Sequence, residues 1–244
     1  MGEKELKLSP RLQCIAELVR SGARLADVGT DHAYLPVWLL QNGKITRAVA
    51  SDVVEGPLSR ARQTAEEYGQ SERLEFRLCD GLDGYDAGEC DVVVIAGMGG
   101  ETMIGILGAA PWLRQEGVTL LLQPMTRAEL LRPWLAENGY RIECERLVRD
   151  RGTIYAVLEV TAGQDAPYTP PEAWCGRKSK GETLYGEYVS DRIRKLEEAA
   201  AGLRRAKQID EALLSSVEAD AAALRREREE WTHANRSGNR KQAL

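Results

Sequence analysis

Short apolar runs alternate with amphipathic stretches along the first 138 residues of the chain. The apolar runs have the length of buried strands and cover residues 24–28, 48–52, 74–78, 91–96 and 118–123. The stretches between them carry apolar residues at helical spacing and cover 35–42, 56–68, 102–110 and 127–138. This alternation predicts a doubly wound α/β domain with a mostly parallel sheet, whose ligand lies at the carboxyl ends of the strands.

The two ends of this domain have patterns of their own. Residues 8–19 have helical spacing, with Ser9 as the expected cap and Pro10 as the first helical residue. Two more strand-like runs, 140–149 and 153–161, flank Asp150-Arg151-Gly152, which predicts a hairpin turn. A strand pair after the fifth helix favours a seven-stranded sheet, with the last strand inserted antiparallel, over a plain dinucleotide-binding domain.

The chain changes character after residue 162. Residues 163–171 are rich in Gly, Pro and polar side chains, which is typical of a linker. Beyond Gly181, apolar residues punctuate a charged, alanine-rich sequence, which predicts a helical hairpin or short coiled coil with a bend near Gln208–Asp210. We therefore expect an α/β domain over 1–162, a linker over 163–181, a helical domain over 182–235 and a frayed tail over 236–244.

Composition excludes several classes of protein. No apolar run is long enough to span a membrane and the N-terminus lacks an apolar signal core, so we expect a cytoplasmic protein with no membrane partner. The five cysteines are scattered and odd in number, which favours reduced thiols. Only His32 and His233 are present, which excludes a multi-histidine site, and we expect no metal.

Charge is distributed unevenly along the chain. The net charge of −5 argues against a globally basic nucleic-acid binder. From Arg177 to the end, however, 15 Lys and Arg accompany 12 Asp and Glu, whereas the remainder carries 18 basic and 26 acidic residues. A mildly basic tail on an acidic body can contact phosphates, although a solvated helical surface has the same composition.

The most informative segment follows the first predicted strand. Leu25-Ala26 leads into Asp27, a turn at Gly29 and the polar cluster Thr30-Asp31-His32, after which the pattern becomes helical. Glycine lets a backbone approach a ligand closely, and a helix N-terminus offers free N–H groups. The G-x-G-x-x-G fingerprint of dinucleotide-binding loops is absent. An acid two residues before a single glycine favours S-adenosylmethionine, because that ligand has cationic ammonium and sulfonium groups and no pyrophosphate.

Three further predicted strands end in polar or glycine-rich loops. Asp52 ends the second strand, where an acid commonly accepts hydrogen bonds from ribose hydroxyls. Asp80-Gly81-Leu82 follows the third and suits an adenine ring, and the glycine-rich turn 96–101 follows the fourth. Each feature has a structural alternative, since Asp31 can cap the next helix and His32 can be structural. Because the loops converge on one edge of the sheet, their combination favours a cofactor site.

Three strings in the chain resemble one bacterial family. They are Ala26-Asp27-Val28-Gly29-Thr30-Asp31-His32-Ala33-Tyr34-Leu35-Pro36, Ala96-Gly97-Met98-Gly99-Gly100 and Leu122-Gln123-Pro124, and the opening Leu8-Ser9-Pro10-Arg11-Leu12 and the helical tail agree with them. Together they are similar to the TrmK family of S-adenosylmethionine-dependent methyltransferases, which modify N1 of adenine 22 in tRNA. The resemblance spans roughly residues 6–235. It implies a Rossmann-like, seven-stranded class I methyltransferase domain with a C-terminal helical, coiled-coil-like domain.

The resemblance also implies roles for individual residues. Arg11 closes over the cofactor carboxylate, Asp52 holds the ribose, and residues 80–82 contact the adenine. Generic methyltransferase loops have further glycines where this chain has Asp31 and Ala33. The expected cofactor-binding set is Arg11, Asp27, Gly29, Thr30, Asp31, His32, Asp52, Val53, Asp80, Gly81, Leu82, Ala96, Gly97, Met98 and Gly99.

Adenine N1 has an in-plane lone pair, so the reaction needs positioning more than a base. Asp31 is the catalytic candidate, because a carboxylate can stabilise the charge that develops on the ring or accept a proton from its exocyclic amine. Tyr34 or Trp112 can stack on the base, although core packing is the commoner role for such residues. Substrate contacts are expected at Gly100, Tyr34, Arg177, Lys178, Arg194, Lys195, Arg225 and Arg226.

Alternatives to this interpretation stay open at the level of sequence. One is a methyltransferase that acts on another RNA site or on a small molecule. A second is a non-catalytic RNA-binding module with a vestigial cofactor pocket, and a third, disfavoured by the missing glycine fingerprint, is a nicotinamide dehydrogenase. The expected partner is tRNA, and the expected oligomeric state is a monomer or weak dimer.

Overall fold

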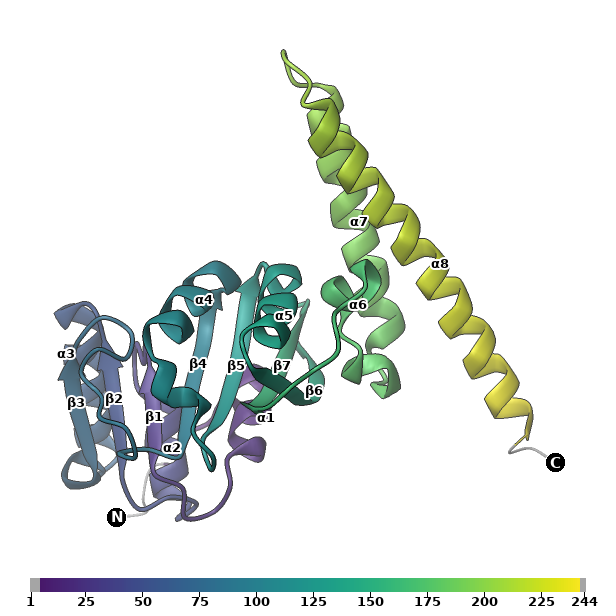
Figure 1. Cartoon of the computed structure of the whole chain (residues 1–244). Helices are drawn as coiled ribbons and strands as arrows, with labels where there is room; N and C mark the ends of the chain where they lie inside the picture. The colour runs from purple at the N-terminus through teal and green to yellow at the C-terminus, as the bar shows by residue number, and fades with distance from the viewer. Residues whose placement is uncertain (1–4, 242–244) are drawn as a thin grey trace. The chain divides into compact units, whose positions relative to one another are not determined.

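The computed structural model describes the backbone of residues 5–241 and the side chains of residues 5–235. Its contacts divide the chain into two compact units, residues 1–166 and 167–244. Figure 1 shows an α/β unit at the N-terminal side of this division and a purely helical unit after it.

The first unit is built on a seven-stranded sheet of order β3-β2-β1-β4-β5-β7-β6. The first five strands are parallel, and β7 lies antiparallel between β5 and β6, as the sequence predicts. The strands are β1 (Leu25–Val28), β2 (Ala48–Asp52), β3 (Leu74–Leu78), β4 (Val92–Gly99), β5 (Thr119–Thr126), β6 (Tyr140–Asp150) and β7 (Thr153–Ala162).

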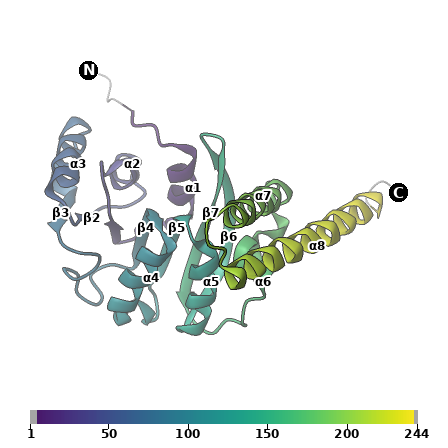
Figure 2. The same cartoon turned by 90° about the horizontal axis from the view of Figure 1, so that it is seen from above.

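Helices cover both faces of the sheet. Figure 2 shows α1 (Pro10–Leu18), α2 (Tyr34–Gln41) and α3 (Glu55–Glu67) on one face, and α4 (Gly100–Ala109) and α5 (Ala128–Glu137) on the other. Short 3-10 helices occupy Ser71–Arg73 and Pro111–Arg114. The predicted start of α1 is confirmed, because the Ser9 hydroxyl accepts a hydrogen bond from the Leu12 N–H at 3.5 Å and Pro10 is the first helical residue.

The central strands form the core of the first unit, because helices cover them on both faces. Every residue of β1 is buried, and so are the first four residues of β4. Such strands have continuous apolar runs instead of alternating patterns. β4 is longer than the sequence predicts, because it continues through the glycine-rich segment to Gly99 with register shifts around Met98. The expected turn is therefore an irregular strand end, and α4 starts directly after it.

The hairpin between β6 and β7 turns within two residues. β6 extends through Asp150, and the turn consists of Arg151 and Gly152, with φ of +47° and +82°. Positive φ at both central positions is the signature of a type I′ turn, whose twist suits antiparallel strands. The predicted hairpin is confirmed, with Asp150 in the strand and not in the turn.

The second unit is helical throughout. It contains α6 (Pro170–Cys175), a 3-10 helix at Lys178–Gly181, α7 (Tyr185–Arg204) and α8 (Glu211–Lys241). Helices α7 and α8 pack as a hairpin over buried residues that include Tyr188, Val189 and Leu224, and the connection contains the predicted bend. No helix among the described residues is long and apolar enough to cross a membrane.

Residues 163–181 differ from the linker that composition predicts. Residues 163–169 have no regular structure, but Thr169 and Glu172 form a capping box at the start of α6. Trp174 then donates from Nε1 to Asp220 of α8 at 3.0 Å. Proline at the first helical positions and a good cap thus start a helix in a segment whose composition alone indicates a loop.

Candidate functional site

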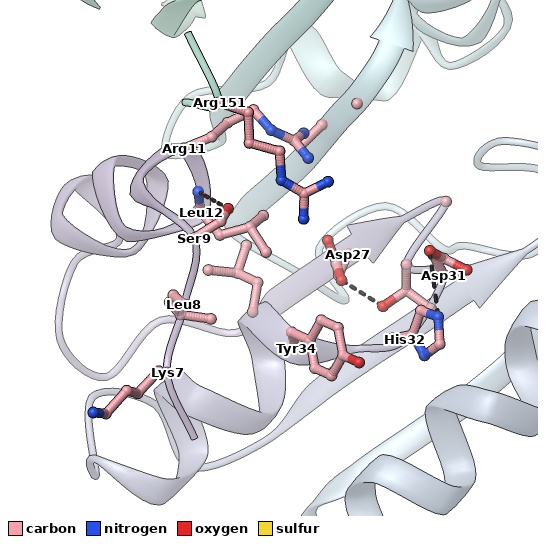
Figure 3. Close-up of a pocket in the computed structure, with 15 residues that line it drawn as sticks. Lys7, Leu8, Ser9, Arg11, Leu12, Asp27, Asp31, His32, Tyr34 and Arg151 are labelled. Atoms are coloured by element: carbon pink, nitrogen blue, oxygen red, sulfur yellow. Dashed lines mark hydrogen bonds and ion pairs between the residues drawn. The ribbon is translucent and has the colours of Figure 1, made fainter. Parts of the chain in front are cut away.

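A pocket of about 500 Å³ opens where the first and fourth parallel strands end. Figure 3 shows it between the start of α1, the loop after β1 and the β6–β7 turn. The residues that line it are Lys7, Leu8, Ser9, Arg11, Leu12, Asp27, Gly29, Thr30, Asp31, His32, Tyr34, Leu35, Ala96, Gly97 and Arg151. The carboxyl ends of the strands therefore carry the site, as doubly wound topology predicts.

The loop after β1 folds tightly over the neighbouring strand. The N–H groups of Gly29 and Thr30 both donate to the carbonyl of Ser51 in β2, each at 2.9 Å. Gly29 has a φ of +70°, and a Cβ there would lie 2.0 Å from Cε of Met98. The backbone conformation therefore favours glycine here, and any side chain would also have to displace the flexible end of Met98.

Asp31 does not cap the following helix. Residue Ala33, in the left-handed region with a φ of +53°, holds the N-cap position of α2, and no side chain caps that helix. Asp31 itself has a φ of +49°, and its carboxylate is ion-paired with Arg60 of α3 at 2.8 Å. The alternative of a helix cap is thus excluded, and Asp31 remains an exposed carboxylate at the pocket.

His32 and Tyr34 form a stacked pair at the same wall. Their ring centroids lie 5.1 Å apart with nearly parallel planes, and Nε2 of His32 lies 3.8 Å from Oδ2 of Asp31. Tyr34 is 41% exposed, so it is not a core residue. Both rings line the pocket, which leaves an aromatic surface available to a ligand.

Asp27 is the buried acid of the site. Its side chain accepts a hydrogen bond from the Thr30 hydroxyl, and only 6% of the residue is exposed. Burial raises the pKa of Asp27 from its ordinary value of 3.8 to about 6; the Thr30 hydrogen bond opposes this shift, and the charge of Asp52 adds to it. A ligand cation beside Asp27 would favour its ionised form and so offset the cost of burying the charge.

Arg11 lies on the opposite wall, held by two partners. Its Nη1 donates to Oε1 of Gln123 at 2.6 Å, and its Nε lies 3.8 Å from the Asp150 carboxylate. Gln123 also accepts from the Gly97 N–H at 3.2 Å. A Cβ at Gly97 would lie 3.2 Å from the Arg11 guanidinium, so the missing side chain leaves room for that cation.

Some predicted cofactor residues lie outside this pocket. Oδ1 of Asp52 accepts a hydrogen bond from the Val54 N–H at 3.1 Å, so this acid partly serves the turn before α3. Val53 and Asp80 are exposed, whereas the Leu82 side chain is 5% exposed and belongs to the core. A direct contact between the Leu82 side chain and a ligand is therefore not supported by the structure.

Glycines at the end of β4, at the start of α4 and in the loop after β3 have packing roles. Met98 lies against Gly29, as noted above, and Gly81 faces Ile106, where a Cβ would lie 3.1 Å away. A Cβ at Gly100 would lie 2.3 Å from the Arg127 carbonyl oxygen, and Gly99 is the N-cap of α4. Gly100 thus permits α4 to pack against the start of α5, which accounts for the glycine without a substrate contact.

Most of the predicted tRNA-binding cations are paired inside the helical unit. Arg177 bonds Glu172 and stacks over Tyr168, whose ring centroid is 4.1 Å from Cζ of the arginine. The helix pairs are Arg194 with Asp191 and Glu198, Lys195 with Asp191, and Arg225 with Glu197. Among the described residues, Lys178 and Arg226 have no such pair. Charge counting from sequence misses this pairing, because it ignores which acids lie one helical turn away, as for Arg194 and Lys195, and which lie on the neighbouring helix, as for Arg225.

Sequence reasoning did not assign site roles to several lining residues. Gln123 does not line the pocket itself but binds Arg11, which does, and the structure buries it fully. A polar glutamine at the end of an apolar strand-like run is the sequence signal that could have found it. Lys7, Ser9 and Leu12 reach the pocket because α1 begins beside it, and Arg151 reaches it from the hairpin turn. These contacts join segments far apart in the sequence, so local patterns give no signal for them.

Two exclusions concern metals and disulfides. Among the described residues, no three His, Cys, Asp or Glu side chains form a group that could hold a metal ion. The five cysteines all lie in the described part of the chain, and none of them forms a disulfide.

Comparisons with known proteins agree with this geometry. A family model described as a methyltransferase domain matches residues 8–158. The tRNA (adenine(22)-N(1))-methyltransferase of Bacillus subtilis is 39% identical over 165 residues, which cover 67% of this chain and 69% of that protein.

Two solved structures hold the cofactor or its product. Sp1610 of Streptococcus pneumoniae in complex with S-adenosyl-L-methionine has a TM-score of 0.77 and 32% identity, covering 89% of this chain and 99% of that one. TrmK of M. capricolum in complex with S-adenosyl-homocysteine has a TM-score of 0.76 and 26% identity, covering 91% and 98%. With its fold, its pocket and these relatives, the chain belongs to the TrmK family of methyltransferases.

Proposed function

We propose that this protein transfers a methyl group from S-adenosylmethionine to N1 of adenine 22 in tRNA. The observation that carries the proposal is the pocket at the ends of β1 and β4, where a buried acid faces an arginine, in a chain 39% identical to a tRNA (adenine(22)-N(1))-methyltransferase. As a tRNA-modifying enzyme, it is expected to act in the cytoplasm as a monomer or weak dimer.

The residues of the pocket fit the cofactor. Asp27 offers a buried carboxylate to a cation, and Arg11, already oriented by Gln123, offers a guanidinium to a carboxylate. Gly29 and Gly97 both line the pocket, and their missing side chains make room for the Met98 side chain and for the Arg11 guanidinium. When bound, S-adenosylmethionine supplies an electrophilic methyl group. Asp52, beside Asp27, is the acid assigned to the ribose hydroxyls.

The protein's part in the reaction is chiefly positioning. The N1 lone pair of adenine attacks without prior deprotonation, so the site must align N1 with the methyl carbon and exclude water. N1 lies on the Watson–Crick edge, and the base therefore leaves its pairing or tertiary contacts to react. The stacked rings of His32 and Tyr34 are the surface on which we place the unstacked base.

Asp31 is the group we assign to the developing charge. Methylation makes the adenine ring cationic, and a carboxylate beside it stabilises that charge or accepts a proton from the exocyclic amine. Arg60 and His32 fix the position of the Asp31 carboxylate, with Arg60 at 2.8 Å. Because Arg60 already neutralises part of its charge, the effect of Asp31 is expected to be moderate.

The helical unit is assigned to the tRNA backbone. Lys178 and Arg226 are its predicted cations without described ion pairs, and they are the ones we expect to contact phosphates most strongly. The other predicted cations would have to exchange an internal carboxylate for a phosphate, which reduces their net contribution to tRNA affinity. They are Arg177, Arg194, Lys195 and Arg225.

Methyl transfer from labelled S-adenosylmethionine to unmodified bacterial tRNA tests the proposal directly. The product nucleoside should be N1-methyladenine at position 22, and a matched tRNA with guanine at that position should accept no label. Label at another nucleotide would refute the assigned position, and cofactor binding without transfer to any tRNA would reopen the substrate.

A further inference from the structure

Two arginines line the pocket, and they are held differently. Arg11 is 23% exposed and is bound by Gln123 and Asp150. Arg151 is exposed, and in the described part of the chain it makes no hydrogen bond or ion pair through its side chain. Figure 3 shows the Arg151 side chain extending from its turn toward the pocket. The pocket thus has one oriented arginine and one that is available to a ligand.

The turn that carries Arg151 is costly for an arginine. Its φ of +47° lies in the left-handed region, where residues other than Gly, Asn and Asp are uncommon. Two-residue hairpin turns of this type favour Asn-Gly or Asp-Gly. Arginine gains nothing from the turn itself, and its side chain is directed at the pocket. A strained residue at a ligand site indicates a role in binding.

Charges of opposite sign occupy different sides of the pocket. Asp27 and Asp31 come from the loop after β1, whereas Arg11 and Arg151 come from α1 and the β6–β7 turn. Cationic groups of a ligand belong near the acids, and anionic groups belong near the arginines. The less exposed Arg11 suits the carboxylate of the small-molecule cofactor, which leaves Arg151 for a second anion.

The size of the pocket indicates which anion this is. A volume of about 500 Å³ accommodates a small molecule and part of a base, but not a nucleic-acid chain. The sugar–phosphate backbone of a reacting nucleotide must therefore stay at the mouth, where Arg151 is exposed. Guanidinium groups bind phosphate oxygens in a bidentate manner.

We propose that Arg151 binds a phosphodiester group of the RNA next to the target adenine and holds the backbone at the pocket mouth while the base is inside. This inference rests on the proposed function, because it takes RNA as the substrate. It makes Arg151 a substrate-positioning residue that does not contact the reacting atoms.

The experiment compares Arg151→Gln, Arg151→Lys and a control, Arg47→Gln. Arg47 is an exposed arginine at the other end of the parallel strands, without an ion pair among the described residues. Affinity for tRNA is measured with S-adenosylhomocysteine present, and affinity for S-adenosylmethionine is measured by calorimetry. Arg151→Gln should weaken tRNA binding about tenfold and reduce the slope of log K against log salt by about one. Arg151→Lys should keep the wild-type salt slope, because the charge is retained, but should lose part of the affinity, because an ammonium group cannot bind the phosphate in a bidentate manner. Arg47→Gln should match the wild type.

A second arm locates the contact on the RNA. A single uncharged methylphosphonate linkage beside the target adenine should weaken binding by the wild type, but should cost Arg151→Gln nothing further. Additive losses would overturn the proposal. So would a loss of S-adenosylmethionine affinity with unchanged tRNA affinity, since Arg151 would then hold the cofactor carboxylate.

The two hypotheses fail in different ways in these assays. If wild-type protein binds tRNA but methylates another nucleotide, the proposed position 22 is wrong, and the methylphosphonate is moved to the nucleotide actually modified. If wild-type protein binds the cofactor but no tRNA, both the RNA substrate and the role of Arg151 are refuted.

Discussion

The Thr30 hydroxyl donates a hydrogen bond to the Asp27 carboxylate, with 2.5 Å between Oγ1 and Oδ2. This bond lowers the pKa of Asp27, but burial outweighs it and the charge of Asp52 adds to the rise, so the pKa reaches about 6. The Asp27 carboxyl group therefore changes charge in a range where enzymes are readily assayed, and its ionisation is coupled to any cation that binds beside it.

Cofactor affinity should accordingly depend on pH. Below about pH 6 Asp27 is increasingly protonated, and the ammonium or sulfonium group of S-adenosylmethionine loses its partner. Calorimetric titration between pH 5 and 8 should show affinity that falls several-fold at the acid end. Asp27→Asn should bind weakly across the whole range without that decline. A variant that kept the wild-type pH dependence would assign the titration to another group.

The same carboxyl group should lower the stability of the ligand-free protein at neutral pH. Because its folded-state pKa of about 6 lies above the ordinary 3.8, the unfolded chain ionises first as pH rises. Stability is therefore lost progressively between about pH 4 and 6, by up to about 3 kcal/mol, and this loss persists above pH 6. Asp27→Asn should unfold at higher denaturant concentration than the wild type at pH 8, and the difference should shrink toward pH 5.

Much of the fold could be predicted from periodicity alone. The boundaries of β2 and β3 agree with the predicted runs, because each run ends at a change of polarity. The boundaries of β4 do not, since pairing with β5 extends the strand through Gly97 to Gly99, and glycine carries no periodic signal. Helix α6 was missed because a capping box and packing on α8 decide it, not composition.

The site residues that come directly after a predicted strand could be predicted from the sequence, whereas those brought in by tertiary structure could not. Asp27 and Gly29 come directly from the first strand and lie in the pocket. Arg151 enters through a hairpin whose turn conformation only the structure shows. The pairing of Arg194 with Asp191 and Glu198 depends on rotamers and helix faces, which a charge count does not contain.

The contact between Gly29 and Met98 predicts a rescue experiment. Gly29→Ala strains a φ of +70° and forces the flexible end of Met98, 2.0 Å from the new Cβ, to move aside, so it should destabilise the protein by about 2 kcal/mol, mostly through the backbone, and weaken cofactor binding. Gly29→Ala combined with Met98→Ala should recover part of the stability, because the steric clash is removed and the backbone strain remains. Chemical denaturation of the four proteins measures the coupling, and strictly additive effects would contradict the contact.

Substitutions of Asp31 and of its partner Arg60 distinguish the charge of the Asp31 carboxylate from its orientation. Asp31→Asn should lower kcat about 10-fold with little change in the affinity for S-adenosylmethionine, because the charge that forms on adenine loses its partner. Arg60→Ala should have a smaller effect, since it frees the carboxylate while losing its orientation. Single-turnover rates across pH check both; an Asp31→Asn enzyme with full rate and an unchanged pH profile would remove Asp31 from the mechanism.

A buried ion pair away from the site makes the strongest prediction about stability. Arg132 of α5 and Glu145 of β6 are both fully buried, with 2.6 Å between Nε and Oε1. Among the described residues, Oε2 of Glu145 and the Tyr140 hydroxyl have no hydrogen-bond partner. Desolvation of two charges offsets most of their attraction, so the pair contributes little net stability while it is intact, but neither member is tolerated alone.

Glu145→Leu or Arg132→Met should each lower the free energy of unfolding by about 3–5 kcal/mol, because each leaves a buried charge without its counterion. Replacing both, as Arg132→Met with Glu145→Leu, should recover most of that loss, since two apolar side chains of similar volume need no counterion. Urea unfolding of the single and double variants distinguishes these outcomes. A double variant as unstable as the sum of the single ones would show that the pair supplies net stability beyond its packing.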